Sequence, residues 1–321
     1  MTRPSAVPPP VTAVLDASSR WLPARLGQVE EVLRAQNGGF GDLLAAGAEA
    51  TLTAGGKRLR PLLVLLCAGT GGGDEHVRAA AAIELVHMAT LVHDDVLDDA
   101  PLRRGVPTVF ASSGAAQAIA VGDLLFSRAF ALLAAHRDTD TVALLAAASV
   151  ALAEGELAQR QDAFDTGISE QRYLERCRLK TATLFRCACL MGRESAALGE
   201  FGAEIGLAFQ LLDDVLDVSG PAERTGKARG TDLLDGTVTL PLILAAEQDP
   251  ELRQVDLHGL DAGTAEGLCD RIAATGALDR VRARALEMVA AAKRKLASDD
   301  FDAEQRQLLG LVADGVVQRY S

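Results

Sequence analysis

Two stretches of the sequence carry the same acidic pentamer, Asp-Asp-Val-Leu-Asp, at residues 94–98 and at residues 213–217. In a helix, positions i and i+4 share a face, so the first and last aspartates of each pentamer are expected to project together. Like charges at this spacing destabilise an isolated helix by about 0.2–0.5 kcal/mol per pair. Because the sequence repeats this unfavourable pattern at the ends of two apolar helices, we infer that the carboxylates bind a positively charged partner.

A hard divalent cation is the ligand that suits such clusters. Mg²⁺ prefers carboxylate oxygens, keeps several waters and completes its shell with substrate phosphates. The calcium-binding EF-hand loop does not fit, since its acidic spacing and its central glycine are missing. We therefore expect more than one Mg²⁺ ion at six aspartates: Asp94, Asp95, Asp98, Asp213, Asp214 and Asp217. The alternative is a pair of solvated acidic helix ends, which an acidic protein can also carry.

Basic residues gather at four places that could bind phosphate. They are Lys57, Arg58 and Arg60; Arg103 and Arg104; Lys180 beside Thr181; and Lys227 near Arg229. A guanidinium binds phosphate oxygens through two parallel hydrogen bonds, and an ammonium supplies a compact charge. Each group alone could be an ordinary surface feature, but beside two acidic clusters they indicate two anionic groups, one held through metal and one held directly. His87 lies two helical turns before Asp94 on roughly the same face, where it is either a phosphate contact or a satisfied core residue.

The composition of the 321-residue chain limits the classes of function. Hydrophobic residues make up 49% of it, enough for a sizeable core. The net charge of −12 argues against nucleic-acid binding, which needs a basic surface. Five cysteines without a C-x-x-C pair are expected to be free, buried thiols rather than disulfides or zinc ligands. Because the N-terminus has no apolar leader and no run reads as a transmembrane helix, we expect a cytoplasmic protein.

Alanine and leucine are abundant and alternating β-branched runs are absent, which predicts an all-α fold. We expect a mobile N-terminal tail over residues 1–22 and a single helical domain over residues 23–321. Glycine and proline mark breaks between elements, at Gly55-Gly56 and at Pro101 for example. The expected helices cover residues 24–36, 40–54, 60–69, 75–99, 114–135, 140–163, 169–189, 195–218, 231–248, 263–274, 277–297 and 302–318.

In this order, the motifs resemble those of the trans-isoprenyl (polyprenyl) diphosphate synthases. The matching segments are Gly55–Pro61, Glu84–His87, the first pentamer with Arg103-Arg104-Gly105, Gly122-Asp123, Lys180-Thr181, Phe209–Asp217, Gly226-Lys227 and Gly230-Thr231-Asp232. The resemblance implies an isoprenoid-synthase helical bundle around a central cavity, usually a homodimer. It also implies the head-to-tail condensation of an allylic diphosphate with isopentenyl diphosphate.

The resemblance further implies a role for each candidate residue. The six aspartates would hold Mg²⁺ against the allylic diphosphate. Five other residues would contact that substrate: Arg103, Lys180, Thr181, Gln210 and Lys227. Four would bind isopentenyl diphosphate: Lys57, Arg60, His87 and Arg104. The residues expected to be catalytic are Asp94, Asp98, Asp213, Lys180 and Lys227. One departure is Thr237, where many members of the family carry a lysine, so one phosphate contact of that loop is expected to be missing.

The helix before the first pentamer also bears on the product. One helical turn rises about 5.4 Å, so Ala89 and Thr90 lie about one turn before Asp94. Val86 and Ile83 lie deeper. A large aromatic residue at position 89 or 90 would close the cavity floor, whereas alanine and threonine leave it open. We therefore expect a long-chain product of more than fifteen carbons, such as a precursor of a quinone side chain. The alternative is that these small residues only permit close helix packing.

Two other functions stay open from the sequence. A class I terpene cyclase shares the aspartate-rich chemistry, but it would leave Lys57 and Arg60 without a second diphosphate to bind. It would also turn over an allylic diphosphate alone. A non-catalytic subunit of a heteromeric synthase would be expected to lose its metal motifs, and both are intact here. Such a subunit would be active only with a second chain.

Overall fold

The computed structural model describes residues 9–18, 20–36, 58–103, 105–220, 229–297 and 301–318. The chain divides into two compact units. Unit 1 comprises Met1–Ser149, Cys187–Gly199 and Ala297–Gly315. Unit 2 comprises Val150–Arg186, Glu200–Leu296 and Val316–Ser321. The helix predicted over residues 40–54 lies outside the described residues.

The described part of the chain is all-α, as predicted. Its helices are α1 Pro9–Ala17, α2 Leu22–Ala35, α4 Leu59–Ala68, α5 Asp74–Leu97, α6 Val109–Ser113, α7 Ala115–Ala134, α8 Thr139–Gln161, α9 Glu170–Cys177, the π-helix η1 Arg178–Ala182, α10 Thr183–Gly192, α11 Ala196–Ser219, α13 Thr231–Leu234, α14 Leu240–Gln248, the 3₁₀-helix η2 Pro250–Gln254, α15 Ala262–Ala274, α16 Ala277–Lys295 and α17 Ala303–Gln318. One short antiparallel hairpin joins β1 Leu102–Arg103 to β2 Val106–Pro107, with Arg103 opposite Val106.

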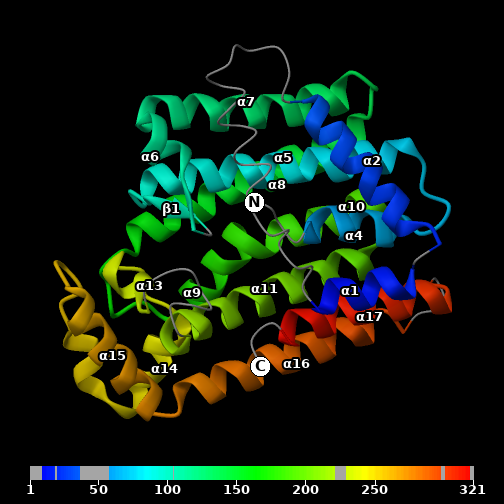
Figure 1. Ribbon diagram of the computed structural model, residues 1–321. Helices are drawn as coiled ribbons and strands as arrows, with labels where there is room; N and C mark the ends of the chain where they lie inside the picture. Colours follow the sequence, from blue (N-terminus) through cyan, green and yellow to red (C-terminus); the bar gives the residue numbers. More distant parts are fainter. Residues whose placement is uncertain are drawn as a thin grey trace. The chain divides into compact units, whose positions relative to one another are not determined.

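Unit 1 is built on α5, which runs beside α7 and packs against α2 and α4 (Figure 1). Every residue of α4 from Pro61 to Cys67 is buried. Full burial of a Leu or Val side chain contributes roughly 1.5–3 kcal/mol, so this helix adds substantially to the core. At Gly122 of α7, an added Cβ would lie 2.2 Å from Nε2 of His93 on α5. Glycine therefore sets how closely α7 approaches the helix that carries the first acidic pentamer.

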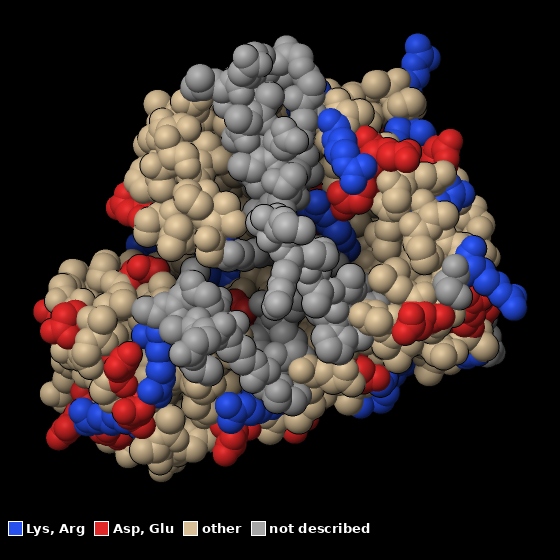
Figure 2. All heavy atoms as spheres, in the orientation of Figure 1, with Lys and Arg blue, Asp and Glu red and all other residues tan. Residues whose placement is uncertain are grey.

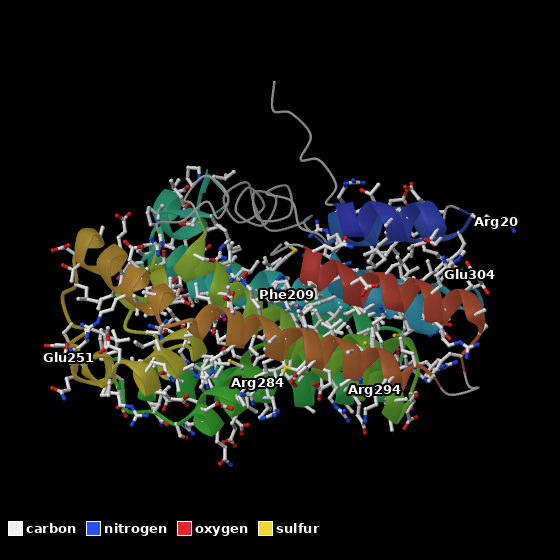
Figure 3. The ribbon with its side chains drawn as sticks, turned by 90° about the horizontal axis from the view of Figure 1, so that it is seen from below. Arg20, Phe209, Glu251, Arg284, Arg294 and Glu304 are labelled. Atoms are coloured by element: carbon white, nitrogen blue, oxygen red, sulfur yellow. The ribbon has the colours of Figure 1, made fainter. Side chains whose placement is uncertain are left out.

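Glycines also determine the packing in unit 2. An added Cβ at Gly155 of α8 would lie 2.5 Å from the backbone N of Lys180. At Gly206 of α11, an added Cβ would lie 2.8 Å from a Cα atom of η1. Both helices therefore press closely on the π-helical segment. Elsewhere in this unit, α14, α15 and α16 pack together (Figure 1). Arg284 of α16, which is labelled in Figure 3, donates a hydrogen bond to Glu170 at the start of α9.

Two of the predicted helices differ from those observed. Residues 231–248 form two helices, α13 and α14, rather than one. The break has a local cause, because Gly236 adopts a left-handed φ of 69° and Pro241 stands in the first turn of α14, where proline is tolerated. Residues 169–189 do not form one α-helix either, since η1 separates α9 from α10.

Part of the expected N-terminal tail is helical. Pro9–Ala17 forms α1, and Val14 within it is fully buried. The prolines at its start are compatible with a helix, because the first turn has no intrahelical N–H partner to lose. Residues 1–8 lie outside the described residues.

The remaining expectations from composition concern cysteines, membranes and surface charge. All five cysteines are free and buried, as predicted. Among the described helices, α7 and α8 are long and apolar enough to span a membrane, and 33% of each apolar window is buried. Length and composition alone are weak evidence of a span, because some core helices and signal sequences meet the same criterion. On the face shown in Figure 2, acidic and basic side chains are interspersed, unlike the basic stripe that nucleic-acid binding uses.

Candidate active site

The first acidic pentamer lies at the end of α5 in unit 1. Its second member, Asp95, is 4% exposed, and its Oδ1 atom accepts a hydrogen bond from Nε of Arg103 at 2.7 Å. Arg103 belongs to β1, so the hairpin that follows α5 holds this carboxylate. Asp94 is half-buried and Asp98 is exposed. The pentamer therefore combines one anchored aspartate with two that reach the surface one helical turn apart.

The second acidic pentamer lies near the end of α11, in unit 2. Its second member, Asp214, is 2% exposed. The hydroxyl of Tyr173 donates to one oxygen of this carboxylate, and Nε2 of Gln210 donates to the other at 2.8 Å. Burial, together with the nearby charge of Asp232, raises the pKa of Asp214 well above its ordinary value.

The two pentamers share one arrangement. In each, the second aspartate is buried and bonded to side-chain donors, whereas the first and fifth are half-buried or exposed. In the second pentamer these are Asp213 and Asp217, and Oδ2 of Asp217 accepts a hydrogen bond from the backbone N of Asp232 at 3.2 Å. First and fifth positions share a helix face. Such a pair can offer oxygens to a cation that takes its other ligands from water and phosphate.

Lys180 and Thr181 both lie in η1. π-Helical turns are rare in proteins, but those that occur often lie at functional sites. Nζ of Lys180 lies 2.5 Å from Oε2 of Glu156 on α8, and Oγ1 of Thr181 donates to Oε1 of Gln210 at 2.7 Å. Burial opposes ionisation of Glu156, but the charges of Lys180 and Arg160 outweigh it and lower the pKa of this carboxyl. The ammonium expected to bind diphosphate is therefore paired with a half-buried carboxylate.

The start of α4 carries the described basic residues of the first motif. Arg58 precedes α4 with a left-handed φ of 46°. Its guanidinium lies 2.6 Å from Glu30 of α2 and 2.8 Å from Glu84 of α5. Burial lowers the pKa of Arg60 to about 10 against the charge of Glu84, so its guanidinium stays protonated at neutral pH. His87 is half-buried and lies one turn after Glu84 on α5.

Three predicted site residues lie outside the described residues, namely Lys57, Arg104 and Lys227. The described candidates come together in two groups. In unit 1 the structure joins Asp95 to Arg103, and in unit 2 it joins Thr181 and Gln210 to Asp214. The departure from the family pattern, Thr237, lies half-buried in the loop between α13 and α14.

A family model described as polyprenyl synthetase matches residues 42–268. The chain belongs to the polyprenyl synthetase family. Heptaprenyl diphosphate synthase component 2 of Geobacillus stearothermophilus is 38% identical over 281 residues, which are 83% of this chain and 87% of that protein. Octaprenyl diphosphate synthase of Escherichia coli is 37% identical over 251 residues, which are 74% of this chain and 78% of that one.

Solved structures of polyprenyl synthases share the fold. A polyprenyl synthase from Caulobacter crescentus, crystallised with calcium and isoprenyl diphosphate, superposes with a TM-score of 0.90 at 35% identity, covering 99% of this chain and 100% of that one. A decaprenyl diphosphate synthase from Rhodobacter capsulatus gives a TM-score of 0.87 at 32% identity, covering 97% of this chain and 99% of that one. This family member is therefore a prenyltransferase with the all-α isoprenoid-synthase fold, as the sequence predicted.

The donor set of this polyprenyl synthetase fits a hard cation. Among the described residues, no group of three or more His, Cys, Asp or Glu side chains lies close enough together to hold a metal ion. Mg²⁺ does not require such a cage, because one or two carboxylates, several waters and substrate phosphates complete its octahedral shell. The first and fifth aspartates of each pentamer carry carboxylate oxygens that would suit such a shell.

Sequence reasoning missed three residues of the site. Tyr173 binds Asp214, Glu156 binds Lys180, and Glu84 binds Arg58. A signal existed for Glu84, since it is the one charge in an otherwise apolar stretch from Ala79 to Val86 and a buried charge needs a partner. No comparable signal marks Tyr173, because its partner Asp214 lies 41 residues away in the sequence, on another helix.

Proposed function

We propose that this chain is a Mg²⁺-dependent synthase that condenses isopentenyl diphosphate head-to-tail with an allylic diphosphate and releases a long-chain prenyl diphosphate. The observation that carries the proposal is the arrangement common to the two identical pentamers, in which the second aspartate is anchored and the first and fifth share a face. Relatives named for heptaprenyl and octaprenyl products support the assignment of a long-chain product.

Four aspartates are proposed to hold the metal ions against the allylic diphosphate: Asp94, Asp98, Asp213 and Asp217. When bound, Mg²⁺ supplies a positive charge that neutralises the diphosphate as it leaves. Support for a divalent ion and a diphosphate comes from the Caulobacter crescentus enzyme, which was crystallised with calcium and isoprenyl diphosphate. Asp95 and Asp214 are proposed to fix the two helix ends, because both are buried and bonded to side-chain donors.

The basic residues divide between the two substrates. We assign Arg103, Lys180, Thr181, Gln210 and Lys227 to the allylic diphosphate, and Lys57, Arg60, His87 and Arg104 to isopentenyl diphosphate. Lys180 is held 2.5 Å from Glu156, so the allylic diphosphate must compete with this carboxylate for the ammonium. Arg60 keeps its charge at neutral pH, as a phosphate ligand requires.

The reaction breaks the C–O bond of the allylic diphosphate, forms a C–C bond to isopentenyl diphosphate, and then loses one proton. Lys180 and Arg103 would stabilise the negative charge that grows on the departing diphosphate. Water must be kept from the allylic cation, because it would trap the cation as an alcohol. We assign the proton to the released diphosphate.

Product length is proposed to depend on Thr90. His87, Thr90 and Asp94 are all half-buried and recur along one face of α5. Ala89 is fully enclosed, which favours a packing role for it. The hydroxyl of Thr90 donates to the carbonyl oxygen of His87 at 2.8 Å, so this small side chain leaves space on the substrate face.

We propose a cytoplasmic homodimer. Exposed apolar side chains support an additional protein contact, since Ile119 of α7 is 46% exposed, and Val150 and Leu157 of α8 are 59% and 64% exposed. A related protein is named as component 2 of a heptaprenyl diphosphate synthase, so a second type of chain is the competing partner. Light scattering on the purified chain distinguishes a dimer of one chain from a monomer that needs another subunit.

The decisive experiment is incubation of the purified chain with farnesyl diphosphate, labelled isopentenyl diphosphate and Mg²⁺, with products sized by chromatography. We expect labelled products longer than the primer, and none when EDTA removes the metal. Turnover of an allylic diphosphate alone to a hydrocarbon would instead identify a terpene cyclase. Activity that appears only after a second chain is added would identify a subunit of a heteromeric synthase.

A further inference from the structure

Tyr173 is a fully buried tyrosine on α9 whose hydroxyl has a specific partner. Its phenol donates to Oδ2 of Asp214 on α11. A buried tyrosine hydroxyl normally finds a hydrogen-bond partner, because an unpaired polar group inside a protein is destabilising. The acceptor of this hydrogen bond is the second member of an acidic pentamer, and the hydroxyl also interacts with the thiol of Cys177 on the same helix.

The hydrogen bond from Tyr173 is one end of a continuous chain. Nε2 of Gln210 donates to the other oxygen of Asp214 at 2.8 Å, and Oγ1 of Thr181 donates to Oε1 of Gln210 at 2.7 Å. Both ends of the Gln210 amide are therefore used. In this orientation the amide nitrogen faces the carboxylate of Asp214 and the amide oxygen faces the hydroxyl of Thr181.

This series of hydrogen bonds explains why Asp214 differs from its neighbours in the pentamer. Asp214 is 2% exposed and each of its oxygens accepts a hydrogen bond from a protein side chain, whereas Asp213 and Asp217 are half-buried. Asp214 and its partners therefore hold the segment that carries Asp213 and Asp217, and supporting contacts around metal-binding residues are usually worth about 10–100-fold in metal affinity or activity.

We propose that Tyr173 is a positioning residue of the prenyl transfer: by holding Asp214, it sets the end of α11 for metal binding by Asp213 and Asp217, and thereby for the diphosphate that the metal holds. This proposal rests on the proposed function, since it concerns the metal and the substrate of that reaction. It assigns Asp214 to the support of the site and leaves the metal to Asp213 and Asp217.

The test is Tyr173→Phe, which keeps the buried ring and removes only the hydroxyl. We expect the Mg²⁺ concentration for half-maximal activity to rise about tenfold and the KM for farnesyl diphosphate to rise, while the KM for isopentenyl diphosphate stays unchanged. Binding of Mn²⁺, followed by electron paramagnetic resonance with an unreactive thio analogue of farnesyl diphosphate, should weaken to the same extent. The matched control is Ser149→Ala, which removes a half-buried hydroxyl that donates to the backbone of its own helix and should change none of these values.

A double-mutant cycle separates a positioning role from simple packing. If Tyr173 acts through Asp214, the double variant Tyr173→Phe/Asp214→Asn should bind Mn²⁺ no more weakly than Asp214→Asn alone. Fully additive losses would overturn the proposal, and so would Tyr173→Phe with wild-type Mn²⁺ binding. Should Tyr173→Phe not fold, Asp214→Asn should still lose less Mn²⁺ affinity than Asp213→Asn, and the reverse order contradicts the proposal. The wild-type chain is assayed first, so a wild-type chain without Mg²⁺-dependent condensation refutes the proposed function itself.

Discussion

Arg103 donates a hydrogen bond from Nε to Oδ1 of Asp95 at 2.7 Å, and this contact ties the hairpin after α5 to the buried member of the first pentamer. The carboxylate side chain is 6% exposed and the arginine side chain 26% exposed, so solvent screens the pair only partly. The hairpin is thus part of the site and does more than connect α5 to α6.

We expect Arg103→Ala to reduce the free energy of unfolding by about 1–3 kcal/mol, because the buried carboxylate of Asp95 would lose a charged donor. Arg103→Lys should restore part of this loss, since an ammonium keeps the charge but cannot reproduce the planar guanidinium geometry. Urea unfolding measures both values. Equal stability of the wild type and Arg103→Ala would mean that the contact does not hold the hairpin.

Glu156 should make the stability of the protein depend on acid pH. Its pKa in the folded chain is lowered from the ordinary value of 4.5, because the charges of Lys180 and Arg160 outweigh the effect of burial. A lowered folded pKa gives stability that is present above pH 4.5 and is lost as the pH falls through the folded value.

The change that tests this is Glu156→Gln, which should flatten the part of the stability–pH curve that lies below about pH 4.5. Urea unfolding at neutral pH and at a series of acid pH values measures the difference. The matched control is Glu154→Gln, an exposed residue of the same helix, which should leave the curve unchanged. A Glu156→Gln curve parallel to that of the wild type would contradict the expectation.

Most of the helices could be predicted from the sequence, because long helices show a regular spacing of apolar residues and have glycine or proline near their ends. It could not predict η1, because the π-turn lies where α8 and α11 approach closely at Gly155 and Gly206, and such contacts are remote in sequence. The break within residues 231–248 could have been predicted, since both Gly236 and Pro241 lie inside the predicted helix.

In the site, too, features set by neighbouring residues could be predicted, whereas features set by residues distant in the sequence could not. The i, i+4 spacing of each pentamer predicts which aspartates share a face. The spacing does not predict which aspartate is buried, because that depends on Arg103 in a hairpin and on Tyr173 in another helix. The side-chain contacts are therefore needed to see that Asp95 and Asp214 are equivalent, each being the buried second member of its pentamer.

Thr90→Phe should shorten the product. A phenyl ring at this half-buried position would fill the space one turn before Asp94, whereas threonine leaves it open. Chromatography of products made from farnesyl diphosphate and isopentenyl diphosphate measures the change. Thr90→Val is the matched control, because it keeps the volume and removes only a hydroxyl that donates to the backbone of its own helix. Long products from Thr90→Phe would show that chain length is set elsewhere.

Gly122→Ala should displace the first pentamer, although residue 122 lies on the neighbouring helix α7. The added Cβ would lie 2.2 Å from Nε2 of His93, a ring that directly precedes Asp94 on α5. The ring must move or the two helices must separate, and overpacking of this kind typically costs about 1–3 kcal/mol. We therefore expect a lower free energy of unfolding together with weaker Mg²⁺-dependent activity.

The chain offers a matched control for this substitution. Gly267 lies within α15, and an added Cβ there meets none of the described atoms within 4 Å beyond the backbone of its own helix. Because glycine inside a helix is less favourable than alanine by roughly 0.5–1 kcal/mol, Gly267→Ala should stabilise the protein while Gly122→Ala destabilises it. Urea unfolding of the two variants side by side gives the sign of each change. If both variants gained stability, the close approach of α7 to His93 would not constrain residue 122.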